Sequence, residues 1–169
     1  IGSALWFFKR SPLGWKLHVA GSEAGLACGL MAVWSGCVWG AAEWGTPWDW
    51  QDYRLNTFGL LTLLALFLVL GRQSQPDGVE SRDTFSTFGL YGFVLVPITY
   101  IATRIWVIRH PGPVIAGDDD SSISGDMAIV LMIGALSFTL LIIGHIMTSV
   151  EITKFEQRID RLQKELDGE

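Results

Sequence analysis

The chain has 169 residues, half of them hydrophobic and only 17% charged, and its mean hydropathy is +0.37. Soluble domains carry about a quarter charged residues, so this composition excludes an ordinary soluble globule. We therefore expect a lipid bilayer as the chain's surroundings. The net charge of −5 also argues against nucleic acid as a partner.

Four apolar segments are long enough to cross a bilayer, because a hydrocarbon layer of about 30 Å needs roughly 20 helical residues. They run from 19 to 40, 55 to 70, 84 to 103 and 127 to 150. We therefore predict an all-α integral membrane protein with a bundle of four transmembrane helices. Glu23 falls in the first turn of the first span, where its carboxylate can reach the headgroups. His145 is the only titratable residue of the last span, and we expect it to form a hydrogen bond in helix packing.

The segments at both ends of this domain of residues 19–150 are also helical in pattern. Residues 1–8 are apolar but too few to span, so we interpret residues 1–18 as the end of a preceding helix and a cytoplasmic loop. Residues 151–169 form a cytoplasmic amphipathic helix of about two heptads. This helix either continues the last span, packing on its own bundle or lying on lipid, or is a docking surface for a cytoplasmic partner. Its apolar residues are Ile152, Phe155, Ile159, Leu162 and Leu166.

Basic residues predict the orientation, since Lys and Arg are retained on the cytoplasmic side. With the N-terminus inside, nine of the twelve basic residues are cytoplasmic, and only Arg54, Arg104 and Arg109 lie outside. A tryptophan loop (residues 39–57) and a histidine loop (residues 104–126) then share the outer face. Asp126 is expected near the start of the last helix, where a carboxylate suits the helix dipole. We interpret the acidic run at 118–120 as a solvated surface in preference to a metal site.

Five of the eight tryptophans fall within residues 34–50. Two interpretations remain open: an aromatic belt that anchors helix ends at the interface, or a platform that holds a flat apolar ligand. The second is favoured because one loop holds most of these side chains and polar residues alternate with them. The candidate residues of the platform and its polar end are Trp39, Trp44, Trp48, Trp50, Asp52 and Arg54.

A porphyrin matches these residue types. Its macrocycle offers an apolar face for indole stacking, its propionates need cations, and its iron needs a nitrogen ligand. Arg54, Arg104 and Arg109 supply cations on the outer side, and His110 supplies an imidazole. His18 lies on the inner side by the same charge pattern, so we reject it as a haem ligand.

The sequence of the tryptophan loop resembles the tryptophan-rich WWD motif of haem-handling proteins in cytochrome c maturation. The resemblance lies in Trp39-Gly40, Trp44-Gly45-Thr46, Trp48, Trp50, Asp52 and Arg54-Leu55-Asn56-Thr57. Residues 96–112 (VPITYIATRIWVIRHPG) are similar to that group's fifth span and its second haem-ligating histidine, here His110. The resemblance covers nearly the whole chain and is closest to the CcmC, or heme exporter protein C, family. It implies that the four spans are the last four of six.

The resemblance also implies a function. Haem b would be a transient cargo, held on the outer face of the plasma membrane by the tryptophan loop and two axial histidines, with His110 as one iron ligand. It would pass to a membrane-anchored haem chaperone, in association with ABC transporter subunits, and the chain would not be an enzyme. The second family histidine lies in a loop between the first and second spans, which these residues do not include.

This chain departs from the family pattern in having Pro47-Trp48 where adjacent tryptophans are usual, and Asp49 rivals Asp52 as the motif aspartate. Two other functions stay open. One is a related haem lyase or synthase component of the same superfamily. The other is a membrane scaffold or permease subunit that binds no haem, in which the tryptophans serve only as anchors.

Overall fold

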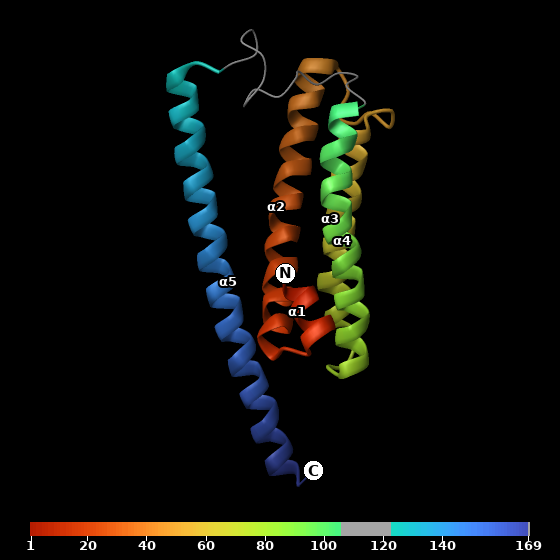
Figure 1. Cartoon of the computed structure of the whole chain (residues 1–169), viewed down its shortest axis with the longest axis vertical. Coiled ribbons are helices and arrows are strands. Elements are labelled where there is room, and N and C mark those ends of the chain that lie inside the picture. Colours follow the sequence, from red (N-terminus) through yellow and green to blue (C-terminus); the bar gives the residue numbers. More distant parts are fainter. Residues whose placement is uncertain (106–122, 169) are drawn as a thin grey trace.

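The computed structural model describes residues 1–105 and 123–168, apart from the side chains of 102–105. The described residues form five helices and no strand: α1 (Gly2–Lys9), α2 (Pro12–Trp44), α3 (Tyr53–Gln73), α4 (Val79–Ile105) and α5 (Gly125–Asp167). Helices α2, α3 and α4 stand side by side, α1 folds back against the first half of α2, and α5 leans away from the others (Figure 1). The prediction of an all-α fold is confirmed.

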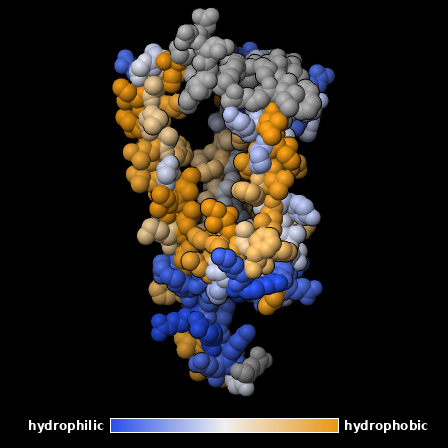
Figure 2. Space-filling view, viewed as in Figure 1, coloured by the Kyte–Doolittle hydropathy of each residue, from blue (hydrophilic) through white to orange (hydrophobic). Residues whose placement is uncertain are grey.

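Four of these helices, α2 to α5, are long and apolar enough to cross a membrane. On the face shown in Figure 2, hydrophobic residues cover most of the bundle, and hydrophilic residues gather toward the end that holds the C-terminus. The four predicted spans are therefore confirmed as helices, although each helix is longer than the apolar run that identified it.

Local capping explains the extra length. Helix α2 begins seven residues before the predicted span because Pro12 suits a first helical turn and the Ser11 side chain accepts from the amide of Gly14 at 3.3 Å. It continues to Trp44 and ends at Gly45, whose φ of 72° is readily adopted by glycine. Helix α5 begins after Ser124, with Asp126 in its first turn as predicted.

The buried core lies at the end of the bundle away from the tryptophan loop. It consists of Trp6, Trp15, Val19, Leu68 and Phe85. The segment expected to be the end of a preceding helix is helical: it forms α1, which ends at Arg10 with φ 51° before the chain enters α2.

Helix α5 is continuous over 43 residues, so the last span and the amphipathic segment form one helix. The amphipathic segment thus continues the last span, a continuity that both of its expected roles allow, packing on the bundle or lipid and docking of a partner. Figure 1 shows that its C-terminal part extends past the ends of the other helices instead of folding back on them.

Candidate functional site: the tryptophan loop

The tryptophan loop lies at one end of the bundle, where α2 ends and α3 begins (Figure 1). Only residues 45–52 are non-helical, so the connection is shorter than the predicted loop of 39–57. Trp39 and Trp44 belong to the last turns of α2, whereas Trp48 and Trp50 lie in the connection. The site is therefore built partly on rigid helix and partly on a short loop.

Side-chain hydrogen bonds fix the path of the connection. The Thr46 hydroxyl donates to the carbonyl oxygen of Trp48 at 2.8 Å, and the Asn56 amide donates to the carbonyl oxygen of Trp50 at 2.7 Å. Because Asn56 belongs to α3, the second bond ties the loop to the helix that follows it. These hydrogen bonds hold the backbones of Trp48 and Trp50, and the indole rings take no part in them.

The four tryptophans form two pairs and not one flat shelf. Trp39 and Trp44 meet with ring centroids 4.8 Å apart and planes at 73°, and Trp48 and Trp50 meet at 5.7 Å and 62°. Both arrangements are edge-to-face, which the quadrupoles of aromatic rings favour. A flat ligand would therefore contact individual indole faces and edges.

Exposure separates the rings that can meet a ligand from those that support them. Trp50 is 81% exposed and Trp39 is 48% exposed, whereas Trp44 and Trp48 are half-buried. The six-membered ring of Trp48 lies against α3, where a Cβ added to Gly59 would come within 2.9 Å of it. Trp48 therefore packs the loop against α3 and leaves Trp50 exposed.

The two candidate motif aspartates have different local roles. Asp52 is buried and is the N-cap of α3, where its carboxylate accepts from the amides of Arg54 at 2.8 Å and Leu55 at 3.2 Å. Asp49 accepts from the amide of Gln51 at 2.9 Å, within the loop. Asp52 thus fixes where α3 starts. From the sequence, Asp52 was expected only as part of the motif's polar end. Arg54 follows it with an exposed side chain.

The predicted residues of the histidine loop fall largely outside the described part. His110, Arg109 and the acidic run at 118–120 lie outside the described residues, and Arg104 is in the last turn of α4 without a described side chain. The flanking helix ends are described: α4 ends and α5 begins at the same end of the bundle as the tryptophan loop (Figure 1).

His18 lies near the opposite end of α2 from Trp44, about 39 Å away along the helix at 1.5 Å per residue. Its Nδ1 is 2.8 Å from the Ser3 hydroxyl, and its ring stacks on Trp15 with centroids 5.0 Å apart. The position agrees with the rejection of His18 as an outer ligand.

Glu23 joins three helices instead of reaching only toward headgroups. Its carboxylate accepts from Arg72 of α3 at 3.0 Å and from the Ser149 hydroxyl of α5 at 2.8 Å. His145 of α5 also faces this carboxylate, with its Nε2 3.9 Å from a Glu23 oxygen, and no hydrogen bond of its ring is seen among the described residues. Ser149 is thus the described side chain of α5 that donates a hydrogen bond to Glu23.

A second aromatic cluster was missed from the sequence. The Trp6 indole donates to Asp83 at 2.9 Å, and the Arg82 guanidinium lies over the rings of Trp6 and Trp15, 5.1 and 5.6 Å from their centroids. Arg10 also pairs with Asp83. The signal in the sequence was the adjacent charges Arg82-Asp83 just before an apolar run. Their partners could not be identified from it, because these lie about 70 residues away in sequence. This cluster fastens α1 to α2 and α4.

Comparison with known proteins gives consistent matches over most of the chain. Residues 1–165 match the family model described as Heme exporter protein C. The heme exporter protein C of Bradyrhizobium diazoefficiens is 26% identical over 163 residues, covering 96% of this chain and 60% of that protein. That of Rhodobacter capsulatus is 25% identical over 168 residues, covering 96% of this chain and 66% of that protein.

A more distant match is the cytochrome c biogenesis protein CcsA of Arabis hirsuta, 27% identical over 100 residues, which are 59% of this chain and 26% of that protein. The chain thus spans 60 to 66% of the length of the first two relatives.

Proposed function

Because this chain belongs to the heme exporter protein C family, we propose that it handles haem in cytochrome c biogenesis and presents it on the outer face of the membrane, at the tryptophan loop. The observation that supports this most is the exposure of Trp50 and Trp39 at the bundle end where α4 and α5 also meet the histidine loop. A ligand held there would lie at the end of the bundle where α4 ends and α5 begins.

The chemistry of the site suits a porphyrin. The exposed indole of Trp50 offers an apolar face to a macrocycle, and the exposed Arg54, four residues further along the chain, offers a cation for a propionate. We propose haem b as a transient cargo, with His110 as an axial ligand of its iron, since imidazole nitrogen is a common haem ligand. Arg104 and Arg109 would serve the second propionate.

Charge distribution supports the orientation. The basic side chains of Arg10, Arg72, Arg82 and Lys154 lie at the end of the bundle opposite the tryptophan loop. Since basic residues are retained in the cytoplasm, we propose that the tryptophan loop faces the periplasmic or extracytoplasmic side of the plasma membrane. Haem presented there would be available to a membrane-anchored haem chaperone, with ABC transporter subunits as further partners. No bond-making step is proposed for this chain.

Haem titration tests the proposal and separates it from a scaffold that uses the tryptophans only as anchors. Purified chain in neutral-lipid nanodiscs is titrated with haem, and the Soret band is followed. We expect a Soret shift that is lost in His110→Ala and retained in His145→Ala, a matched control at the opposite end of the bundle. Absence of any shift in the full-length protein favours the scaffold, and an unchanged shift in His110→Ala refutes the ligand assignment.

A further inference from the structure

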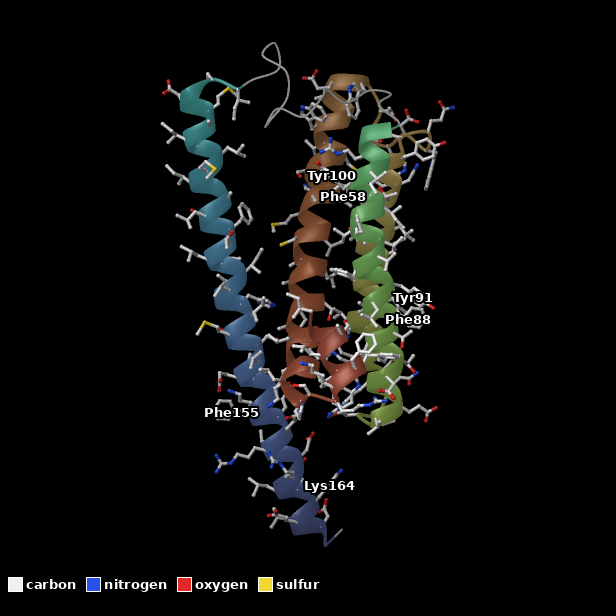
Figure 3. The ribbon with its side chains drawn as sticks, in the orientation of Figure 1. Phe58, Phe88, Tyr91, Tyr100, Phe155 and Lys164 are labelled. Carbon is white, nitrogen blue, oxygen red and sulfur yellow. The ribbon has the colours of Figure 1, made fainter. Side chains whose placement is uncertain are left out.

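The C-terminal part of α5 carries an apolar face that no described residue covers. Figure 3 places Lys164 of this segment beyond the ends of the other helices. Among the described helices, the backbone of α5 lies near α2 alone, close to Glu23, and Ile152 and Glu156 line a hollow that they share with Arg72 and Gln73 of α3. The apolar side chains of the segment are between 51 and 86% exposed. We call the following residues the α5 stripe: Ile152, Phe155, Ile159, Leu162 and Leu166.

The α5 stripe runs along one side of the helix. Its residues recur at steps of three and four, which is the spacing of positions a and d in a coiled coil. From Ile152 to Leu166 it extends about 21 Å at 1.5 Å per residue. A surface of this form fits a second helix laid alongside α5.

A lipid surface is a poor occupant for this stripe. An interfacial helix lies in the plane of the membrane, whereas α5 continues without a break from its membrane span. Residues 151–169 contain six acidic and four basic side chains. A cytoplasmic leaflet is negatively charged and attracts basic segments, so it would not attract this one.

The residues that flank the α5 stripe give it an acidic border. With Ile152 at position a, the flanking e and g positions are Glu151, Glu156, Arg158, Gln163 and Glu165. Three of these five are acidic and only one is basic. Charges at such positions select the partner of a helix.

A second copy of this chain is disfavoured by the same charges. Two copies in one membrane share an orientation, so their α5 helices would pair in parallel. Position g of one helix then faces position e of the next heptad in the other, which places Glu151 against Glu156 in both directions. The next such pair, Arg158 with Gln163, provides no compensating ion pair.

We propose that the α5 stripe is a docking surface for a partner helix that is amphipathic and carries Lys or Arg on both borders of its apolar face. Such a helix would bury the stripe and pair its cations with Glu156 and Glu165, whereas Glu151 is already paired with Lys154 of its own helix. Docking would add a helix to the part of α5 that extends past the bundle. The tryptophan loop, at the opposite end, takes no part in it.

The test uses two designed peptides as probes of the full chain in neutral-lipid nanodiscs. Both are fluorescein-labelled, three heptads long, with Ile and Leu at positions a and d; one has Lys at all e and g positions and the other has Glu. Binding is measured by fluorescence anisotropy. We expect the Lys peptide to bind at least tenfold more tightly than the Glu peptide. The preference should reverse in the double variant Glu156→Lys/Glu165→Lys.

Two further variants define the surface. Ile159→Ser/Leu162→Ser should lose binding of the Lys peptide, with thermal unfolding of the membrane domain unchanged because these side chains are 54% and 51% exposed. Lys164→Gln, at position f outside the border, should bind the Lys peptide within twofold of the unmodified chain.

Equal binding of the two peptides, or retained binding by Ile159→Ser/Leu162→Ser, overturns the proposal. It is also overturned if the chain forms dimers that are lost in that double variant, since a second copy would then be the occupant. Quenching of a bimane label on Leu166→Cys by brominated lipids would assign the stripe to the membrane. The cysteine variant is made after Cys28 and Cys37 are replaced by Ser, so that the label is unique.

Discussion

The indole of Trp48 lies so close to Gly59 of α3 that a methyl group at Gly59 would approach the ring atom Cη2 to 2.9 Å. Trp48 in turn meets Trp50 edge-to-face, with centroids 5.7 Å apart. The exposed ring of the tryptophan loop is therefore positioned through a contact between the loop and the third helix. A ring so placed is available for a ligand without a rearrangement of the loop.

Gly59→Ala should displace Trp48 and disturb the loop. Overpacking of a closely fitted contact costs about 1 to 3 kcal/mol, so we expect a lower unfolding temperature and weaker haem retention. Tryptophan fluorescence of the purified variant and haem titration measure the two effects. Gly36→Ala is the matched control, because a Cβ at Gly36 meets nothing within 4 Å. Equal behaviour of the two variants would contradict the role given to the contact.

Trp50→Ala should weaken haem retention directly, because Trp50 is the most exposed ring of the tryptophan loop at 81%. Stacking of a flat ring on an aromatic side chain contributes about 1 to 3 kcal/mol, which corresponds to a loss of about five-fold to more than a hundred-fold in affinity. Trp34→Ala is the control, since Trp34 is 74% exposed but lies ten residues before Trp44 on α2. Similar losses in both variants would argue for a general effect of removing indoles.

Asp52→Ala should destabilise the chain by about 1 kcal/mol, because it removes the N-cap of α3. Asp52→Asn should retain most of the stability, since an asparagine oxygen can accept the same amide hydrogen bonds. Thermal unfolding in detergent compares the two variants, and haem titration then shows whether the charge matters beyond the cap. If Asp52→Asn is as destabilised as Asp52→Ala, capping is not the role of this residue.

Ser149→Ala should loosen α5 from the bundle. The hydroxyl donates to Glu23 at 2.8 Å, and hydrogen bonds between membrane helices contribute about 1 kcal/mol. Ser137→Ala provides the comparison, because that hydroxyl donates to Ile133 of its own helix at 2.8 Å and is exposed. Unfolding in detergent should be shifted by the first substitution and not by the second. The reverse order would show that α5 is held by other contacts.

The spans could be predicted because crossing a membrane requires about 20 apolar residues in sequence, a property of the chain alone. The ends of the helices were harder to predict from the sequence. The cap at Ser11, for example, extends α2 by seven residues before Val19, where the apolar run begins. The tryptophans could be recognised as a group, but their edge-to-face pairing depends on how Trp48 packs on Gly59. That contact joins two helices and leaves no periodic signal.

Long-range polar contacts were also out of reach. Glu23 was expected near headgroups because its own segment suggested nothing else, and its partners Arg72 and Ser149 lie on α3 and α5. Trp6 and Asp83 likewise come from distant segments. The amphipathic stripe of α5 was predicted correctly from spacing, since helical periodicity is local.

The central claim is that the tryptophan loop and His110 face the same outer compartment. Cysteine accessibility tests it in a chain whose Cys28 and Cys37 are replaced by Ser. Single cysteines at Gln51 and Gly112 should both react with a membrane-impermeant maleimide added to intact cells or spheroplasts, and one at Gln157 should react only after permeabilisation. Labelling of Gln51→Cys and Gly112→Cys from opposite sides of the membrane would contradict the account.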